Sequence, residues 1–245
     1  MTSAPLPVPG THNLRDVGGL LASGGVIRER VLMRSDGLGR LGEAGRAALR
    51  QLGVDTVVDL RSSDEVHRMP DDLDGSGIRH VHLPIFQVSM AETLSGGHTL
   101  DSLYSSIIRS NGVALTDVVR VIATDEGCVL VHCTAGKDRT GIVIALALLA
   151  VGVSRTDVAE NYAATEANLA AEWVPAMRAR RAAIDFAETP DSLQLLGASP
   201  VQAIEAIIDH VESEFGSAAD YLLAHGLHDL ELAALRLRLA PHLPT

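Results

Sequence analysis

Aromatic residues and cysteine are scarce in this chain. Phe, Trp and Tyr make up 3% of the 245 residues, and the two cysteines are Cys128 and Cys133. Two cysteines exclude a disulfide framework, and their odd spacing along one strand turns the side chains to opposite faces, so they cannot pair. We therefore expect Cys128 to be an ordinary buried strand residue. We also expect a reducing compartment, the cytoplasm, where a free thiolate at Cys133 survives.

Long apolar runs and an excess of positive charge are also missing. The longest apolar stretch, residues 142–153, is interrupted by Gly152 and is too short to cross a bilayer, so stable membrane insertion is not expected. Lys and Arg number 20 against 31 Asp and Glu, which gives a net charge of −11 at pH 7. This charge argues against a general affinity for nucleic acid, so any phosphate binding must depend on a local positive field.

Residues 1–10 contain three prolines and no basic side chain. This composition predicts a disordered arm rather than a secretory signal, and export without a recognisable signal stays open. Residues 11–245 carry no linker rich in Pro, Gly or Ser and are expected to form a single domain.

Within that domain, strand and helix patterns alternate over the first 150 residues. The expected elements are a helix over 41–52, strands over 54–60 and 78–85, and two helices within 100–123. Beyond Gly152 the pattern is helical, with an insertion over 155–200 and C-terminal helices over 200–245. The fold class is therefore α/β, with a central, largely parallel sheet flanked by helices and a helical C-terminal region. Ligands of such folds bind at the carboxyl ends of the strands.

One segment combines a nucleophile with an anion site. Val129–Val131 is typical of a buried strand and residues 142–150 of a buried helix, and the loop between them carries Cys133 and, six positions later, Arg139. Backbone amides and the positive end of the helix dipole converge at a helix start, where they bind an anion and stabilise a thiolate. The predicted phosphate-binding loop comprises Thr134, Ala135, Gly136, Lys137, Asp138 and Arg139.

Three other interpretations of this segment remain open on the residues alone. Cys133 can be a small buried hydrophobe, the loop can serve a rhodanese-like sulfurtransferase, or an inactive module can use it to recognise phosphorylated partners. The run from Lys137 to Gly141 favours phosphate, because the planar fork of Arg139 offers two parallel N–H donors to an oxyanion. We therefore favour a phosphatase.

The stretch His132–Gly141 resembles the signature loop of the cysteine-dependent phosphatase superfamily, in the version found in bacterial atypical tyrosine and lipid phosphatases. Three further segments agree with that family: Asn13–Gly19, Leu52–Ser62 and Phe215–Leu222. The resemblance implies a tyrosine-phosphatase-like fold in which residues 155–200 form a lid over the active site. It also implies a metal-independent phosphomonoesterase, with no cofactor, that acts on phosphotyrosine proteins through a cysteinyl-phosphate. Phosphoinositides or small phosphate esters are the alternative substrates.

The resemblance assigns roles to the loop residues. Cys133 is the nucleophile and Arg139 holds the phosphate. The hydroxyl of Thr140 is implied to hydrogen-bond the cysteine sulfur. His132 is expected to orient the loop through backbone hydrogen bonds rather than to transfer protons.

The general acid departs from the family pattern. Related phosphatases carry an aspartate after the third strand, where this chain has Gln87, and an amide cannot donate a proton as a carboxylic acid does. We therefore assign the acid to Asp138, with Glu92 and Asp101 of the following loop as rivals.

Residues around the loop are assigned supporting roles. Lys137 is expected to supply a second cation for multiply phosphorylated substrates. Asp59, Arg61 and Asp16 are expected to brace the loop from the strands and the N-terminal motif. A metal site at His80 and His82 is not expected, because no third ligand with suitable spacing is evident.

Overall fold

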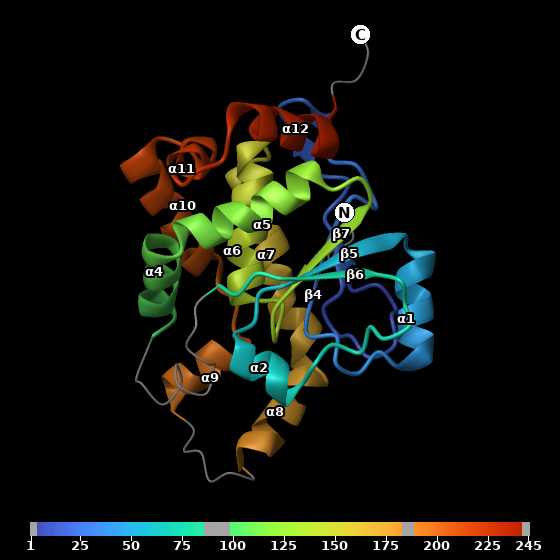
Figure 1. The fold of residues 1–245 in the computed structure, drawn as a ribbon. Helices are drawn as coiled ribbons and strands as arrows, with labels where there is room; N and C mark the ends of the chain where they lie inside the picture. The colour runs from blue at the N-terminus through green and yellow to red at the C-terminus, as the bar shows by residue number, and fades with distance from the viewer. Residues whose placement is uncertain (1–3, 86–98, 183–188, 242–245) are drawn as a thin grey trace.

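The computed structural model of the protein describes residues 4–85, 99–182 and 189–241. Its centre is a five-stranded sheet in the order β1-β4-β7-β5-β6 (Figure 1). β4, β7, β5 and β6 are parallel, and β1 pairs antiparallel with β4 at one edge. The strands of this sheet are β1 (Arg15–Asp16), β4 (Leu32–Ser35), β5 (Val54–Asp59), β6 (Arg79–His82) and β7 (Cys128–His132), and β2 (Leu21–Ala22) and β3 (Gly25–Val26) form a separate hairpin. The predicted α/β class with a largely parallel sheet is confirmed.

Helices cover the two faces of the sheet unequally (Figure 1). α1 contacts β5, while α6 contacts β4 and β7 and is surrounded by α4, α5, α7, α10, α11 and α12. The helices are α1 (Gly42–Gln51), α2 (Ser63–Arg68), α4 (Leu100–Ser110), α5 (Gly112–Thr124), α6 (Asp138–Ala150), α7 (Arg155–Ala170), α8 (Trp173–Ala182), α9 (Pro190–Gly197), α10 (Val201–Phe215), α11 (Ala218–Ala224) and α12 (Asp229–Leu239). α6 is almost entirely apolar because it lies in the middle of this thick helical layer.

The alternation of side chains along β7 divides the core in two. Val129 and Val131 belong to the larger cluster with α6, whereas Cys128 and Leu130 belong to a smaller one with α1. Cys133 lies one residue beyond the strand and joins the larger cluster, so the two cysteines occupy opposite faces and both are free. Burial raises the pKa of Cys128 to about 12, which keeps it a thiol. The predicted structural role of Cys128 agrees with this position.

The N-terminal segment differs from the expected disordered arm. The amide of Leu6 donates to the carbonyl oxygen of Leu14 at 2.7 Å, and Val8 is buried against the smaller cluster. Residues 4–10 therefore pack on the domain. Prolines remove backbone donors and restrict φ, which suits an ordered extended segment as well as an unfolded one, so composition alone does not separate the two.

The helical region predicted over 155–200 comprises α7, α8 and α9 in its described parts. α8 contacts both α7 and α9. α8 and α9 lie at the same end of the molecule as α2, which follows the carboxyl end of β5 (Figure 1). Its role as a lid stays a prediction. None of the helices that the structure describes is long and apolar enough to span a bilayer.

Candidate active site

The loop between β7 and α6 begins at the carboxyl end of the central strand. Gly136 has a φ of +65°, and a Cβ at this position would lie 2.3 Å from the carbonyl oxygen of Ser35. Only glycine fits there, so the chain turns tightly against β4 and enters α6 at Asp138. Cys133 and Arg139 are both buried at this turn. The predicted strand, loop and helix around the cysteine are thus present, with the free amides of a helix start beside it.

A carboxylate from α2 holds the guanidinium of Arg139. Glu65 accepts from Nη1 at 2.6 Å and from Nη2 at 2.8 Å, and it also accepts from the hydroxyl of Thr134. A third, longer contact of 3.5 Å runs from Nη1 to the carbonyl oxygen of Leu60. Within the described residues these contacts use both hydrogens of Nη1 and one hydrogen of Nη2. The Nε–H group and the second hydrogen of Nη2 therefore stay available to a ligand.

This pairing sets the charge of both partners. Burial alone would raise the pKa of Glu65, but the hydrogen bonds and charge of Arg139 together with the Thr134 hydroxyl lower it to about 2. Burial would lower the pKa of Arg139. The hydrogen bonds and charge of Glu65 and the charge of the nearby Cys133 outweigh this effect, so the pKa of Arg139 rises above its usual value. Arg139 is therefore a fixed cation with a fixed orientation.

Two further arginines lie behind the loop. Arg34 in β4 donates to the carbonyl oxygen of Gly136 at 2.7 Å and to Oδ1 of Asn161 at 2.9 Å. Arg15 in β1 donates to Thr165 at 2.8 Å, and the side-chain amide of Asn13 donates to the carbonyl oxygen of Ala135 at 3.1 Å. Burial lowers the pKa of Arg34 to about 10 in spite of the Cys133 charge, so Arg34 remains charged at neutral pH. Arg34 and Asn13 thus bind the carbonyl oxygens of Gly136 and Ala135. A loop whose carbonyls are bound in this way can offer its amides to an anion.

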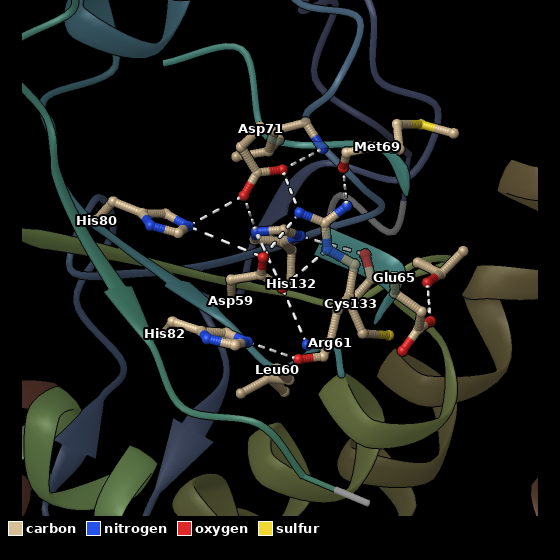
Figure 2. A network of polar contacts seen from close by, with 12 residues as sticks. Asp59, Leu60, Arg61, Glu65, Met69, Asp71, His80, His82, His132 and Cys133 are labelled. Atoms are coloured by element: carbon tan, nitrogen blue, oxygen red, sulfur yellow. Dashed lines mark hydrogen bonds and ion pairs between the residues drawn. The ribbon is translucent and has the colours of Figure 1, made fainter. Parts of the chain in front are cut away.

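A buried ion-pair network fixes His132, the residue before the nucleophile (Figure 2). Nε2 of His132 lies 3.0 Å from Oδ2 of Asp71, and Nδ1 lies 3.2 Å from the carbonyl oxygen of Cys133. Burial would lower the pKa of His132, but the charge of Asp71 raises it above its usual value. The ring of His132 is thus held between Asp71 and the loop backbone, and its role in orienting the loop stays a prediction.

Asp59 and Arg61 complete this network. Arg61 binds Asp59 with two hydrogen bonds of 2.9 and 2.7 Å, and it also reaches Asp71 at 2.8 Å. His80 joins from β6, with Nε2 3.2 Å from Asp71 and 3.8 Å from Asp59, and its interactions with Asp59 and then Asp71 raise its pKa to about 9. These contacts place Asp59 and Arg61 in the network around His132, and their role in bracing the loop stays a prediction.

Asp138 opens α6 inside a second buried cluster. Its Oδ1 accepts from Nζ of Lys137 at 2.7 Å and from the hydroxyl of Tyr104 at 2.8 Å. Nζ of Lys137 also donates to the carbonyl oxygen of Ala198 at 3.0 Å, which ties the loop to the segment that follows α9. Lys137 is fully buried. Its ammonium therefore braces the loop in this structure and does not extend toward a second phosphate group, which differs from the sequence expectation.

Comparisons with known proteins identify the family of the chain. The model of the tyrosine phosphatase family matches residues 6–241. The chain belongs to this family. It is 34% identical over 206 residues to the triple specificity protein phosphatase PtpB of Mycobacterium tuberculosis, with 71% of each protein covered. A tyrosine-protein phosphatase of Nostoc commune is 33% identical over 223 residues, which cover 84% of this chain and 73% of that protein. A crystal structure of TpbA from P. aeruginosa aligns at 21% identity with a TM-score of 0.36, covering 62% of this chain and 86% of TpbA.

The remaining predicted residues of this phosphatase take varied positions. Thr140 is buried, and its hydroxyl has no hydrogen-bond partner among the described residues, so the implied bond to the cysteine sulfur is not formed here. Asp16 accepts from the amides of Gly18 and Arg30 at 2.8 and 2.7 Å and stabilises the turn after β1, away from the loop. Asp101 is exposed on α4, and Glu92, the other rival for the acid, lies outside the described residues, as does Gln87.

Sequence reasoning missed several residues that hold the phosphatase site together. Glu65 had a detectable signal, because Ser62 and Glu65 form a capping box at the start of α2 directly after the Asp59–Arg61 motif. Asp71 and Arg34 had none, since neither lies in a recognisable motif. Tyr104 is one of three tyrosines in the chain, and a buried tyrosine commonly seeks a polar partner.

One group of side chains in the described residues has the proximity of metal ligands: Asp59, Asp71 and His80, whose ligand atoms lie within 4.8 Å of one another. The carboxylates already bind Arg61 and the two histidines. These cations fill the positions that a metal ion would need, so we interpret the group as part of the ion-pair network.

Glu65→Gln tests the Arg139 pair by its pH dependence. Because the pKa of Glu65 is lowered to about 2, its stabilising effect is complete above the ordinary value of 4.5 and disappears as the pH falls toward 2. We expect the wild type to exceed the variant in free energy of unfolding by about 3 kcal/mol at neutral pH. This difference should shrink steadily below pH ~4.5 when urea unfolding is followed at each pH.

Asp64→Asn is the matched control for this change, since Asp64 lies on the same helix turn and is exposed. It should alter the free energy of unfolding by less than about 0.5 kcal/mol. A difference between the wild type and Glu65→Gln that stays constant from neutral to acid pH would contradict the ionic clamp.

Proposed function

We propose that this tyrosine phosphatase is a metal-independent phosphomonoesterase that hydrolyses phosphotyrosine in proteins through a cysteinyl-phosphate on Cys133. The observation that carries the proposal is the loop that places Cys133 directly after β7 and Arg139 in the first turn of α6, with Arg139 oriented by Glu65. A phosphate bound to the loop amides meets the free N–H groups of Arg139 on one side and the sulfur on the other.

The first step transfers the phosphoryl group to the protein. The thiolate of Cys133 attacks phosphorus, the S–P bond forms, and the bond between phosphorus and the tyrosine oxygen breaks. Asp138 gives its proton to the departing oxygen, so tyrosine leaves as the neutral phenol. Arg139 and the loop amides stabilise the charge that spreads over the phosphoryl oxygens.

The second step restores the enzyme. Water attacks phosphorus and passes one proton to the Asp138 carboxylate, the S–P bond breaks, and the thiolate leaves. Inorganic phosphate departs, and both residues return to their starting states. No metal ion or cofactor is required for either step.

Phosphotyrosine is favoured over multiply phosphorylated lipids by the position of Lys137. A headgroup with several phosphates needs additional cations at the loop, and the Lys137 ammonium is already bound to Asp138 and to the Ala198 carbonyl. The related PtpB is named a triple specificity phosphatase. A panel of phosphotyrosine peptides, phosphoserine peptides and phosphoinositides therefore tests the substrate class directly. A preference for phosphoinositides would overturn the assignment.

Cys133→Ser tests the nucleophile. A serine hydroxyl is not ionised at neutral pH, so turnover of a phosphotyrosine peptide should fall below detection. The loop amides and Arg139 are unchanged, so the peptide should still bind, as calorimetry can measure. Cys128→Ser, which removes the other thiol, should keep its activity. Measurable turnover by purified Cys133→Ser would rule out the cysteinyl-phosphate. Absence of turnover in the wild type would instead indicate an inactive phosphate-binding module.

Arg139→Lys tests the phosphate clamp. An ammonium group preserves the charge but lacks the planar fork, so it cannot bind Glu65 and the phosphate at once. We expect kcat/KM to fall by about 100-fold or more, with loss of the salt bridge to Glu65. A decrease of less than about tenfold, measured on the folded variant, would show that Arg139 does not bind the phosphate.

Asp138→Asn tests the general acid by its dependence on the leaving group. The rate for phenyl phosphate should fall by about 100-fold, whereas p-nitrophenyl phosphate, whose anion leaves without a proton, should lose much less. Asp101→Asn is the control on the described part of the chain. An equal loss for both substrates would make Asp138 a structural brace. A leaving-group-dependent loss in Glu92→Gln or Asp101→Asn would assign the acid to that residue instead.

A further inference from the structure

Two buried tyrosines stand in line behind Asp138. The hydroxyl of Tyr104, on α4, lies 2.8 Å from Oδ1 of Asp138, and the hydroxyl of Tyr162, on α7, lies 2.6 Å from that of Tyr104. Each ring is only 1% exposed. The three residues come from three different helices, so the chain has brought them together by tertiary packing.

The directions of these hydrogen bonds follow from the number of protons. Tyr104 has one phenolic hydrogen, and the Asp138 carboxylate can only accept, so Tyr104 donates to Asp138. The oxygen of Tyr104 is then the acceptor for Tyr162. Burial raises the pKa of Tyr104 well above its usual value, and the negative charge of Asp138 adds to this. Tyr104 therefore stays a protonated donor throughout the working pH range.

The two oxygens of Asp138 have different surroundings. Oδ1 accepts from Tyr104 and from Nζ of Lys137 at 2.8 and 2.7 Å. Among the residues that the structure describes, Oδ2 makes no hydrogen bond with another side chain. A carboxylic acid whose one oxygen accepts two hydrogen bonds carries its proton on the other oxygen, because the first oxygen then keeps its lone pairs for the donors.

We propose that Tyr104, supported by Tyr162, is a positioning residue for catalysis: it holds Oδ1 of Asp138 so that Oδ2 is the oxygen that delivers the proton to the leaving group. This inference rests on the proposed role of Asp138 as the general acid. It goes further by naming the atom that carries the proton and the residue that keeps the carboxyl group in place.

The packing supports a fixed position for the tyrosine pair. The rings of Tyr104 and Tyr162 meet edge to face at 6.2 Å between centroids. Gly141, one turn into α6, makes room for them, since a Cβ there would lie 2.9 Å from Cδ2 of Tyr162. Gly141, the last residue of the signature loop, thus lets Tyr162 approach the helix that carries Asp138.

Three sets of charged and titratable groups lie around Asp138. Lys137 and Arg139 flank it on its own segment, Tyr104 and Tyr162 approach from α4 and α7, and the charge of Arg34 on β4 acts on both tyrosines and on Cys133. Replacement of Tyr104 by Phe removes one donor and leaves all of these charges in place. Its effect on the pH profile therefore reports on the hydrogen bond itself.

Tyr104→Phe should change how proton donation depends on pH. The carboxylate loses a donor that favours its charged form, so the acid should keep its proton to higher pH. We expect the alkaline limb of kcat/KM for phenyl phosphate to move upward by roughly one pH unit. The variant should also lose more rate with phenyl phosphate than with p-nitrophenyl phosphate, because its carboxyl group is less well aimed.

Tyr221→Phe is the matched control. Tyr221 is equally buried, and its hydroxyl donates to the carbonyl oxygen of Ile108 at 2.7 Å, away from Asp138. It should lower the free energy of unfolding as Tyr104→Phe does and leave the alkaline limb where it is. Tyr162→Phe, which keeps Tyr104, should move the limb in the same direction by a smaller amount, and it provides the test if Tyr104→Phe does not fold.

A double-variant cycle separates this role from a structural one. If Tyr104 acts through the carboxyl proton, Tyr104→Phe should change kcat/KM less than twofold in an Asp138→Asn background, where no proton is donated. If Tyr104→Phe lowers kcat/KM equally in the wild-type and Asp138→Asn backgrounds, the positioning role is overturned. The same holds if the alkaline limb of its pH profile stays where it is in Tyr221→Phe. If Asp138→Asn itself leaves the alkaline limb intact, both the acid assignment and this inference are overturned.

Discussion

Burial of charge is the constraint on which this site depends. The loop between β7 and α6 carries Lys137, Asp138 and Arg139 in succession, and all three are buried. A buried charge is stable only when it is paired and hydrogen-bonded. Each of the three therefore requires a partner from another element. Lys137 binds the Ala198 carbonyl, Asp138 binds Tyr104, and Arg139 binds Glu65. The helices around the loop are placed by these requirements as much as by apolar packing.

The same constraint explains the residues on the far side of the loop. Arg15 and Arg34 are buried behind it and donate to carbonyl and hydroxyl oxygens rather than to carboxylates. Buried positive charge is costly in the free protein and becomes more favourable when the loop holds a thiolate or a phosphate. A protein with a net charge of −11 thereby concentrates positive potential at one point.

The scarcity of aromatic residues makes their positions informative. The chain has three tyrosines, and each is buried with its hydroxyl bonded. Tyr104 and Tyr162 converge on Asp138, whereas Tyr221 braces the end of α4. A phenol combines a large apolar ring with one directed hydrogen-bonding group. It can therefore fill the core beside α6 and orient a carboxyl group from within it.

The sequence alone indicated the α/β class with its largely parallel sheet and the strand–loop–helix segment that carries Cys133 and Arg139. A buried strand, a glycine at the turn and an apolar helix lie within about twenty consecutive residues, so local patterns were enough to place Cys133 and Arg139. The supporting residues were decided only by tertiary structure. Glu65 lies 74 positions from Arg139, and Arg34 lies 102 positions from the Gly136 carbonyl that it binds. The position of Lys137 also needed the fold, because only the packed chain shows whether a lysine beside an aspartate faces the ligand or the interior. Periodicity records which face of an element is buried, but hydrogen bonds between distant elements depend on how those elements pack.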